Sequence, residues 1–134
     1  MSTDRMRSIV AAVPTGGGRI ALEWSDGTRA ELPLAAGSTA SIGDWGHSLV
    51  WPDGREIGAD ALWLETLSAI GRDDARAFLE WRIANGLSLS GAGEALGLSR
   101  RTVAYYSNGD RPVPKAILLA CKGWDSLRPK RRAA

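Results

Sequence analysis

The sequence predicts an α+β fold, in which a small antiparallel β-hairpin and helix domain over residues 1–70 precedes an all-α domain over residues 71–126. Alternating apolar residues flank both Asp26-Gly27 and Pro52-Asp53-Gly54, which is a pattern typical of β-hairpins. In the second half, apolar residues recur at helical spacing on both sides of Gly97, which predicts two helices joined by a tight turn.

The other elements of the first half follow from composition and turn signals. We expect a first strand over residues 6–13 and a Pro- and Gly-rich loop over residues 14–18. Residues 33–46 contain few bulky apolar side chains, and we expect a loop there with one short strand or turn. Asp60 can cap a helix over residues 61–70. The apolar face of this helix comprises Leu62, Trp63, Leu67 and Ile70.

Four tryptophans, at positions 24, 45, 51 and 63, lie in this first half. A core built from about 65 residues is marginal, and large aromatic side chains fill such a core efficiently. We therefore expect these tryptophans to be core residues. A dimer surface is the alternative for some of them, because tryptophan is enriched in interfaces.

Capping and periodicity predict the helices of the second half. A helix is expected over residues 74–85, and a last helix is expected to begin near Pro114. Between them, Ser88 and Ser99 each precede an apolar periodic run and are the predicted N-caps of the helix pair. The second helix of the pair then begins at Arg100 and ends near Asn108-Gly109. The predicted core residues are Ala75, Phe78, Leu79, Ile83, Leu89, Ala92, Leu96, Ile117, Leu118 and Cys121, with Trp124 just beyond.

The predicted helix over residues 100–108 has two different faces. Val103 and Tyr106 are three positions apart and, with Ser99, are expected to pack on the preceding helix. At 100° per residue, the opposite face carries Arg101, Ala104, Tyr105 and Asn108, with Arg100 and Thr102 on its flanks. Arginine can bind guanine with two hydrogen bonds, asparagine can bind adenine, and small apolar groups can contact a thymine methyl. The candidate DNA contacts are Ser88, Ser90, Ser99, Arg100, Arg101, Thr102, Ala104, Tyr105, Asn108 and Arg111.

Residues 74–122 resemble the Cro/repressor-type helix-turn-helix family, which has the lambda-repressor-like fold. The segments that carry the resemblance are Trp81-Arg82, Gly86-Leu87-Ser88, Ala95 to Val103 and Asn108 to Arg111. The resemblance implies four or five helices, the third of which reads DNA. It places Arg100, Arg101, Thr102 and Tyr105 in the stretch that contacts bases and phosphates. The family often has glutamine where Leu89 stands and alanine where Gly93 stands, so one expected phosphate contact lacks its usual side chain here.

Residues 6–70 resemble a small bacterial α+β domain family of unknown function. The resemblance is carried by Asp26-Gly27 and by the run from Val50 to Ile57 that leads into Leu62. In that family the domain is found alone or joined to a helix-turn-helix, and the resemblance implies no known catalysis.

Charge is divided unevenly along the chain. Residues 1–70 contain five Lys or Arg and nine Asp or Glu, a net charge of −4, whereas residues 71–134 contain twelve and six, a net charge of +6. A polyanion would be attracted to the second half, which also contains the predicted helix pair. Residues 127–134 form a basic tail that we expect to be disordered, and that would either follow DNA phosphates or remain solvated.

The composition disfavours several classes of function. With His47 and Cys121 as the single histidine and cysteine, we expect neither a metal site nor a disulfide. The chain has no nucleophile elbow and no phosphate-binding loop, so we expect no catalytic residues and no cofactor. Asp73-Asp74 is interpreted as charge that complements a helix dipole. No apolar run approaches the ~20 residues of a membrane span, and no signal peptide is recognisable, so we expect a cytoplasmic protein.

The sequence therefore predicts a bacterial or phage transcriptional regulator, a homodimeric repressor that binds double-stranded DNA in the major groove. The first domain would supply the dimer contact or bind a protein partner. One alternative is an antitoxin-like or other protein-binding module with an accessory, autoregulatory DNA-binding domain. Another is a ligand-sensing regulator with a pocket among the tryptophans of the first half.

Overall fold

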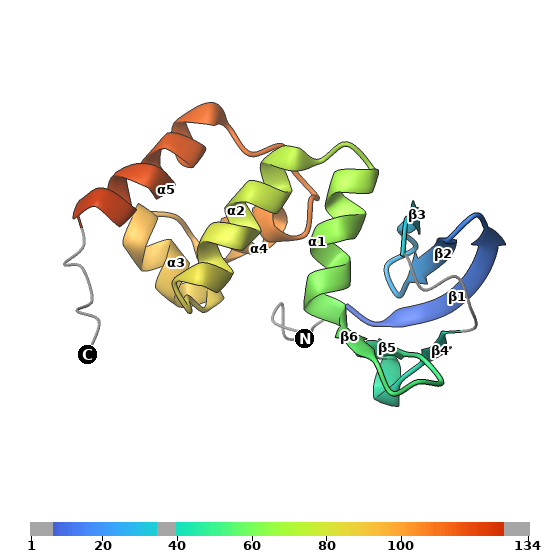
Figure 1. Cartoon of the computed structure of the whole chain (residues 1–134). Coiled ribbons are helices and arrows are strands. Elements are labelled where there is room, and N and C mark those ends of the chain that lie inside the picture. The colour runs from blue at the N-terminus through green and yellow to red at the C-terminus, as the bar shows by residue number, and fades with distance from the viewer. Residues whose placement is uncertain (1–6, 35–39, 128–134) are drawn as a thin grey trace. The chain divides into compact units, whose positions relative to one another are not determined.

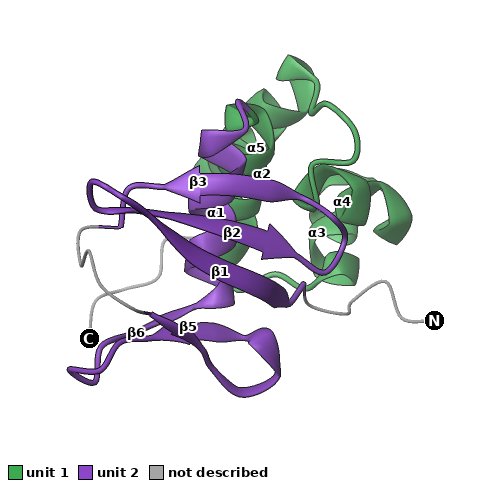
Figure 2. Cartoon of the chain, turned by 90° about the vertical axis from the view of Figure 1, so that its right-hand side faces the viewer, with its two compact units in different colours: residues 1–4, 72–134 green, residues 5–71 purple. Residues whose placement is uncertain are grey.

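The computed structural model describes residues 7–34 and 40–127. The described residues divide into two compact units, of which one comprises residues 7–34 and 40–71 and the other comprises residues 72–127 (Figure 2). Six strands, a short 3₁₀ helix and one α-helix of the described residues belong to the first of these units, and four α-helices belong to the second (Figure 1). The predicted α+β class is confirmed.

Three antiparallel strands form the larger sheet, in the order β1 (Ile9–Gly16), β2 (Arg19–Trp24) and β3 (Arg29–Leu32). The turn between β2 and β3 places Gly27 at a φ of 91°, a conformation that is unfavourable for residues with a Cβ. Asp26 stabilises the turn because its carboxylate accepts hydrogen bonds from the backbone N–H and the hydroxyl of Thr28, both at 3.0 Å. The hairpin predicted at Asp26-Gly27 is confirmed.

A smaller antiparallel sheet contains β4 (Ser41–Ile42), β5 (Ser48–Val50) and β6 (Glu56–Gly58), in that order. The turn between β5 and β6 is the second predicted hairpin. It is closed by hydrogen bonds from the Trp51 N–H to the Arg55 carbonyl and from the Gly54 N–H to the Trp51 carbonyl, each 2.9 Å long. β4 and a short 3₁₀ turn at Asp44–Gly46 are the elements described within the segment predicted to be mostly loop.

Helix α1 (Ala59–Ala69) packs against the larger sheet, and Trp24 of β2 contacts this helix with 1% of its surface exposed. The rings of Trp24 and Trp63 meet edge to face, with centroids 5.2 Å apart. The indole N–H of Trp24 donates to the Thr66 hydroxyl at 3.0 Å, so its polar group is satisfied inside the core. The other buried apolar residues of this unit are Ile9, Ile20, Leu22, Leu32, Leu49, Trp51, Ala59, Leu62 and Leu67.

Three predictions about β1 and α1 are wrong. β1 continues through Pro14 to Gly16, because an edge strand tolerates a proline that lacks an N–H donor. Helix α1 begins at Ala59, so Asp60 lies inside the first turn and favours the helix through its charge. Ile70 follows the end of α1 and is 41% exposed, so it is not a core residue.

Trp45 is 88% exposed, in contrast to the other tryptophans of this unit. It adopts a φ of 61°, a left-handed conformation that is rare for residues other than glycine. The following residue, Gly46, lies against β1, where an added Cβ would be 2.6 Å from the carbonyl oxygen of Ile9. The core prediction is confirmed for Trp24, Trp51 and Trp63, and it is wrong for Trp45.

The second unit contains α2 (Asp73–Ala84), α3 (Leu89–Leu96), α4 (Arg100–Ser107) and α5 (Lys115–Leu127). Each helix begins within one residue of its predicted start. Leu127 belongs to α5, so the tail predicted from residue 127 begins too early. Residues 128–134, which carry the rest of that tail, lie outside the described residues.

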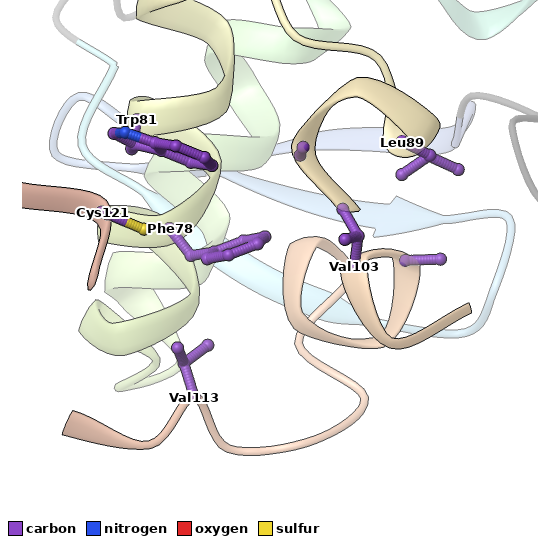
Figure 3. Packing of buried hydrophobic residues seen from close by; sticks show 8 residues of the cluster. Phe78, Trp81, Leu89, Val103, Val113 and Cys121 are labelled. Carbon is purple, nitrogen blue, oxygen red and sulfur yellow. The ribbon is translucent and has the colours of Figure 1, made fainter. Parts of the chain in front are cut away.

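Buried side chains from all four helices meet in one cluster (Figure 3). Phe78 is fully buried in this cluster and meets the ring of Tyr106 edge to face, with centroids 5.5 Å apart. Burial, together with the negative charge of Asp125, raises the pKa of the Cys121 thiol to about 11, which fits a packing role. The prediction that Ile83 is a core residue is wrong, because the residue is 49% exposed. The cluster comprises Phe78, Trp81, Leu89, Ala92, Val103, Ala104, Val113 and Cys121.

Gly93 shows how closely α3 approaches the turn that follows it. An added Cβ would lie 2.5 Å from the carbonyl oxygen of Leu98, and the Leu98 N–H donates to the Gly93 carbonyl at 2.8 Å. The Gly93→Ala variant is therefore expected to lower the free energy of unfolding by about 1–3 kcal/mol, because the backbone must move. Urea unfolding followed by the helical circular-dichroism signal measures this change.

The matched control is Gly123→Ala in α5, where nothing lies within 4 Å of an added Cβ. This variant is expected to raise stability by up to about 1 kcal/mol, because alanine is the better helix former. Stabilisation by both substitutions would contradict the close approach at Gly93.

Candidate nucleic-acid interface

Hydrogen bonds fix where α3 and α4 begin and where α3 ends. The Ser88 hydroxyl accepts from the Gly91 N–H at 2.9 Å, and the Ser99 hydroxyl accepts from the Thr102 N–H at 3.0 Å. Between the helices, Gly97 has a φ of 72°, which ends α3 in a left-handed cap. Both predicted N-caps are confirmed, and α3 and α4 form a helix-turn-helix arrangement.

The outward side of α4 carries cations and hydrogen-bonding groups. Arg100 and Arg101 are exposed, and Thr102, Tyr105 and Asn108 are partly exposed. Residues 99–108 include no aspartate or glutamate, so the two guanidinium groups dominate the local charge of this helix. The remaining predicted contacts, Ser88, Ser90, Ser99 and Arg111, are also exposed. This surface therefore offers donors to an anionic partner.

The prediction that Ala104 lies on the outward face is wrong. Ala104 is 6% exposed, and Val103 and Ser107 are buried beside it. Helix α4 contacts both α2 and α3, so its buried arc is wider than packing on α3 alone would make it. Positions i, i+1 and i+4 of a helix fall within such an arc. The methyl group of Ala104 thus belongs to the core and offers little surface to a base.

Arg82 of α2 stabilises the pair formed by α3 and α4 through hydrogen bonds. Its guanidinium donates to the carbonyl of Leu87 at 3.0 Å and to the hydroxyl of Ser107 at 2.7 Å. The Ser107 hydroxyl in turn donates to the Val103 carbonyl at 2.8 Å. One side chain therefore joins the segment that precedes α3 to the last turn of α4. The sequence resemblance includes Arg82 but does not reveal this role.

A second polar contact joins the start of α2 to the segment that follows α4. Arg72 pairs with Asp74 at 3.2 Å and donates to the carbonyls of Gly109 and Arg111, the latter at 3.0 Å. The carboxylate of Asp74 also accepts from the Val113 N–H at 2.7 Å. Asp74 therefore does more than complement the helix dipole. The position of Asp74 at a helix start is visible in the sequence, but its partner Val113 lies 39 residues away, and the carbonyls that Arg72 binds lie 37 and 39 residues from Arg72.

Arg111 lies beside the C-terminal end of α4. Its guanidinium carbon is 4.1 Å from the centroid of the Tyr105 ring, which is the geometry of a cation–π contact. The backbone N–H groups of Asp110 and Arg111 both point to the Tyr105 carbonyl, at 2.9 and 3.4 Å. Two of the predicted site residues, Tyr105 and Arg111, are thus brought together by the fold.

Surface pockets are found in the first unit. One, of about 580 Å³, is lined by Trp45, His47 and Glu56 among others, and another, of about 460 Å³, is lined by residues of the larger sheet. Within residues 7–34 and 40–127, no group of three metal-ligating side chains is found. No helix in these ranges combines the length and apolar character that crossing a bilayer requires.

The chain is similar over its whole length to a protein of known structure. The chain is similar to the crystal structure of NE0471 from Nitrosomonas europaea ATCC 19718, a presumed DNA-binding protein, with 28% sequence identity and a TM-score of 0.65. The similarity covers 100% of this chain and 96% of NE0471, so it includes both units. No family model matches the sequence, and no curated protein matches it.

The ion pair between Arg72 and Asp74 is expected to make the stability of the fold depend on pH. Burial opposes ionisation of Asp74, but hydrogen bonds from Arg72 and from the backbone N–H groups of Val113 and Ala75 lower its pKa below the ordinary 3.8. The ionised carboxylate therefore stabilises the fold above about pH 4, and this contribution is lost as the pH falls through the lowered pKa.

We expect wild-type protein to be more stable than Asp74→Asn at pH 6, and we expect the difference to shrink as the pH falls below the ordinary pKa of Asp74. Urea unfolding at a series of pH values between 6 and 2 measures this difference. A difference that stays constant over the whole series would contradict the assignment, because it would not depend on the charge of Asp74.

Proposed function

We propose that this protein is a sequence-specific transcriptional regulator of the Cro/repressor type, which reads the major groove of double-stranded DNA with α4. The observation that carries the proposal is the two-sided character of α4. Its inner side is buried on α2 and α3, and its outer side carries Arg100 and Arg101. Eight helical residues are about 12 Å long, a length that suits the major groove.

Two further observations support DNA as the partner. The similarity to NE0471, a presumed DNA-binding protein, extends over the whole chain. The net charge of +6 on residues 71–134 arises from twelve basic and six acidic side chains, so the half that contains α3 and α4 attracts a polyanion. Residues 5–71 carry no such excess of cations and would contribute through dimerisation or a protein partner.

The side chains of the proposed interface differ in the groups of DNA that they can contact. Arg101 and Asn108 suit bidentate contacts to guanine and adenine. Arg100, Thr102, Tyr105 and Ser99 suit contacts to bases or phosphates along the groove. Arg111, Ser88 and Ser90 suit phosphate contacts, which position the protein without reading sequence.

We further propose that the protein acts as a homodimer on a near-palindromic site and represses transcription by covering promoter DNA. One helix-turn-helix unit makes too few contacts for tight selective binding, and two-fold symmetry doubles them. The two half-sites should then lie about 34 Å apart, or one helical turn of DNA. Selection of bound duplexes from a random pool tests the symmetry of the site, and sedimentation equilibrium tests the dimer.

The Arg101→Ala variant tests the orientation of α4. It is expected to lose about 1–3 kcal/mol of binding free energy at the selected site and to become tolerant of substitution at one base pair. Fluorescence anisotropy with the selected duplex and its single-base variants measures both effects.

The matched control is Arg29→Ala, which removes one cation from β3, where the side chain is 77% exposed. This variant is expected to bind the selected duplex almost as the wild type does. If both variants lost affinity equally and kept the same base preference, net charge alone would explain binding and the assigned role of Arg101 would be wrong.

A further inference from the structure

We propose that Arg72, held in place by Asp74, is a positioning residue for DNA binding, which fixes residues 109–113 so that Arg111 is presented to a phosphate. This inference rests on the proposed function and assigns a role to residues outside the helix pair.

The Arg72–Asp74 ion pair anchors the segment between α4 and α5 to the start of α2. The carbonyls of Gly109 and Arg111 both accept hydrogen bonds from Arg72, and the N–H of Val113 donates to Asp74. Val113 itself is 6% exposed and belongs to the core cluster. The pair therefore joins the backbone of this segment to the first turn of α2 at three points.

The guanidinium of Arg72 suits this task because its donors form a rigid planar fork. Nε donates to one carboxylate oxygen of Asp74, Nη1 donates to the Gly109 carbonyl, and Nη2 donates to the Arg111 carbonyl. A lysine ammonium is a compact donor on a flexible stem and does not reproduce this geometry. The side chains of Arg72 and Asp74 are each 26% exposed, so water competes only partly for their hydrogen bonds.

Contacts with Arg72 and Tyr105 restrict both the backbone and the side chain of Arg111. Its carbonyl is bound by Arg72, its N–H points to the Tyr105 carbonyl at 3.4 Å, and its guanidinium lies over the Tyr105 ring. A side chain ordered before binding loses less conformational entropy when it meets its target. The hydrogen bonds of Arg72 thus hold Arg111 at the end of α4, beside the proposed DNA-reading surface.

The test uses the full chain and a labelled 30-base-pair duplex of random sequence, titrated at several KCl concentrations. If Arg111 contacts a phosphate, Arg111→Ala should reduce the slope of log affinity against log salt concentration by about 1. Arg72→Gln should reduce the slope by the same amount, and the double variant should show no further loss, because both changes remove one contact. Arg72→Lys, which keeps the charge, should behave as Arg72→Gln does.

The control is Arg76→Gln, which removes one positive charge a turn further along α2, where Arg76 pairs with Glu80 at 3.3 Å. Its salt slope should match that of the wild type. A thermal unfolding curve for each variant establishes that it is folded at the assay temperature. If Arg72→Gln unfolds, Arg72→Lys and Asp74→Asn give the same comparison.

The outcomes separate the two proposals. A wild-type protein that binds no duplex at low salt overturns the proposed function. A wild-type protein that binds, together with Arg72 variants that keep its salt slope, overturns the positioning role alone. That role is also overturned if Arg111→Ala leaves the slope unchanged, if Arg76→Gln reduces it equally, or if the effects of the Arg72 and Arg111 substitutions simply add.

Discussion

The burial of the inner side of α4 is the constraint on which the rest of the second unit depends. Val103 is fully buried and Ala104 and Ser107 are nearly so, and together they fix the rotation of α4 about its own axis. A helix of eight residues has little stability of its own, so this packing on α2 and α3 both forms the helix and orients it. Once the inner side is fixed, Arg100 and Arg101 have only the outward side available to them.

Polar contacts support this packing in the segments that precede α3 and follow α4. Arg82 binds the backbone before α3 and the hydroxyl of Ser107 in α4, whereas Arg72 and Asp74 bind the backbone after α4. Each of these arginine side chains contacts two segments that are distant in the sequence, so the contacts restrict the conformations of the connecting segments. The interface is thus organised by apolar packing at its centre and by arginine-centred hydrogen bonds at its ends.

Features that depend on neighbouring residues could be predicted from the sequence, whereas contacts between residues far apart in the sequence could not. Ser88, Gly97 and Ser99 act within three or four residues of themselves, and their capping roles could be predicted from spacing alone. The burial of Ala104 could not, because it depends on a second helix that packs on α4 from another direction. The partners of Arg72 are 37 and 39 residues away, and no periodicity connects them. Pro14 shows a further limit, because its place in a strand depends on that strand being at the edge of its sheet.

The position of Arg72 has a consequence for how this chain can be divided or recombined. Gly71 is the last residue of one compact unit, and Arg72 is the first residue of the stretch that builds the other. A fragment that began at Asp73 would keep every residue of α2 to α5 and yet lack the donor that ties down residues 109 and 111. The junction between residues 71 and 72 therefore contributes to the structure of the second unit. A chimera joined after Arg72 would take α2 to α5 from one protein, and the residue that anchors the loop between α4 and α5 would come from the other protein.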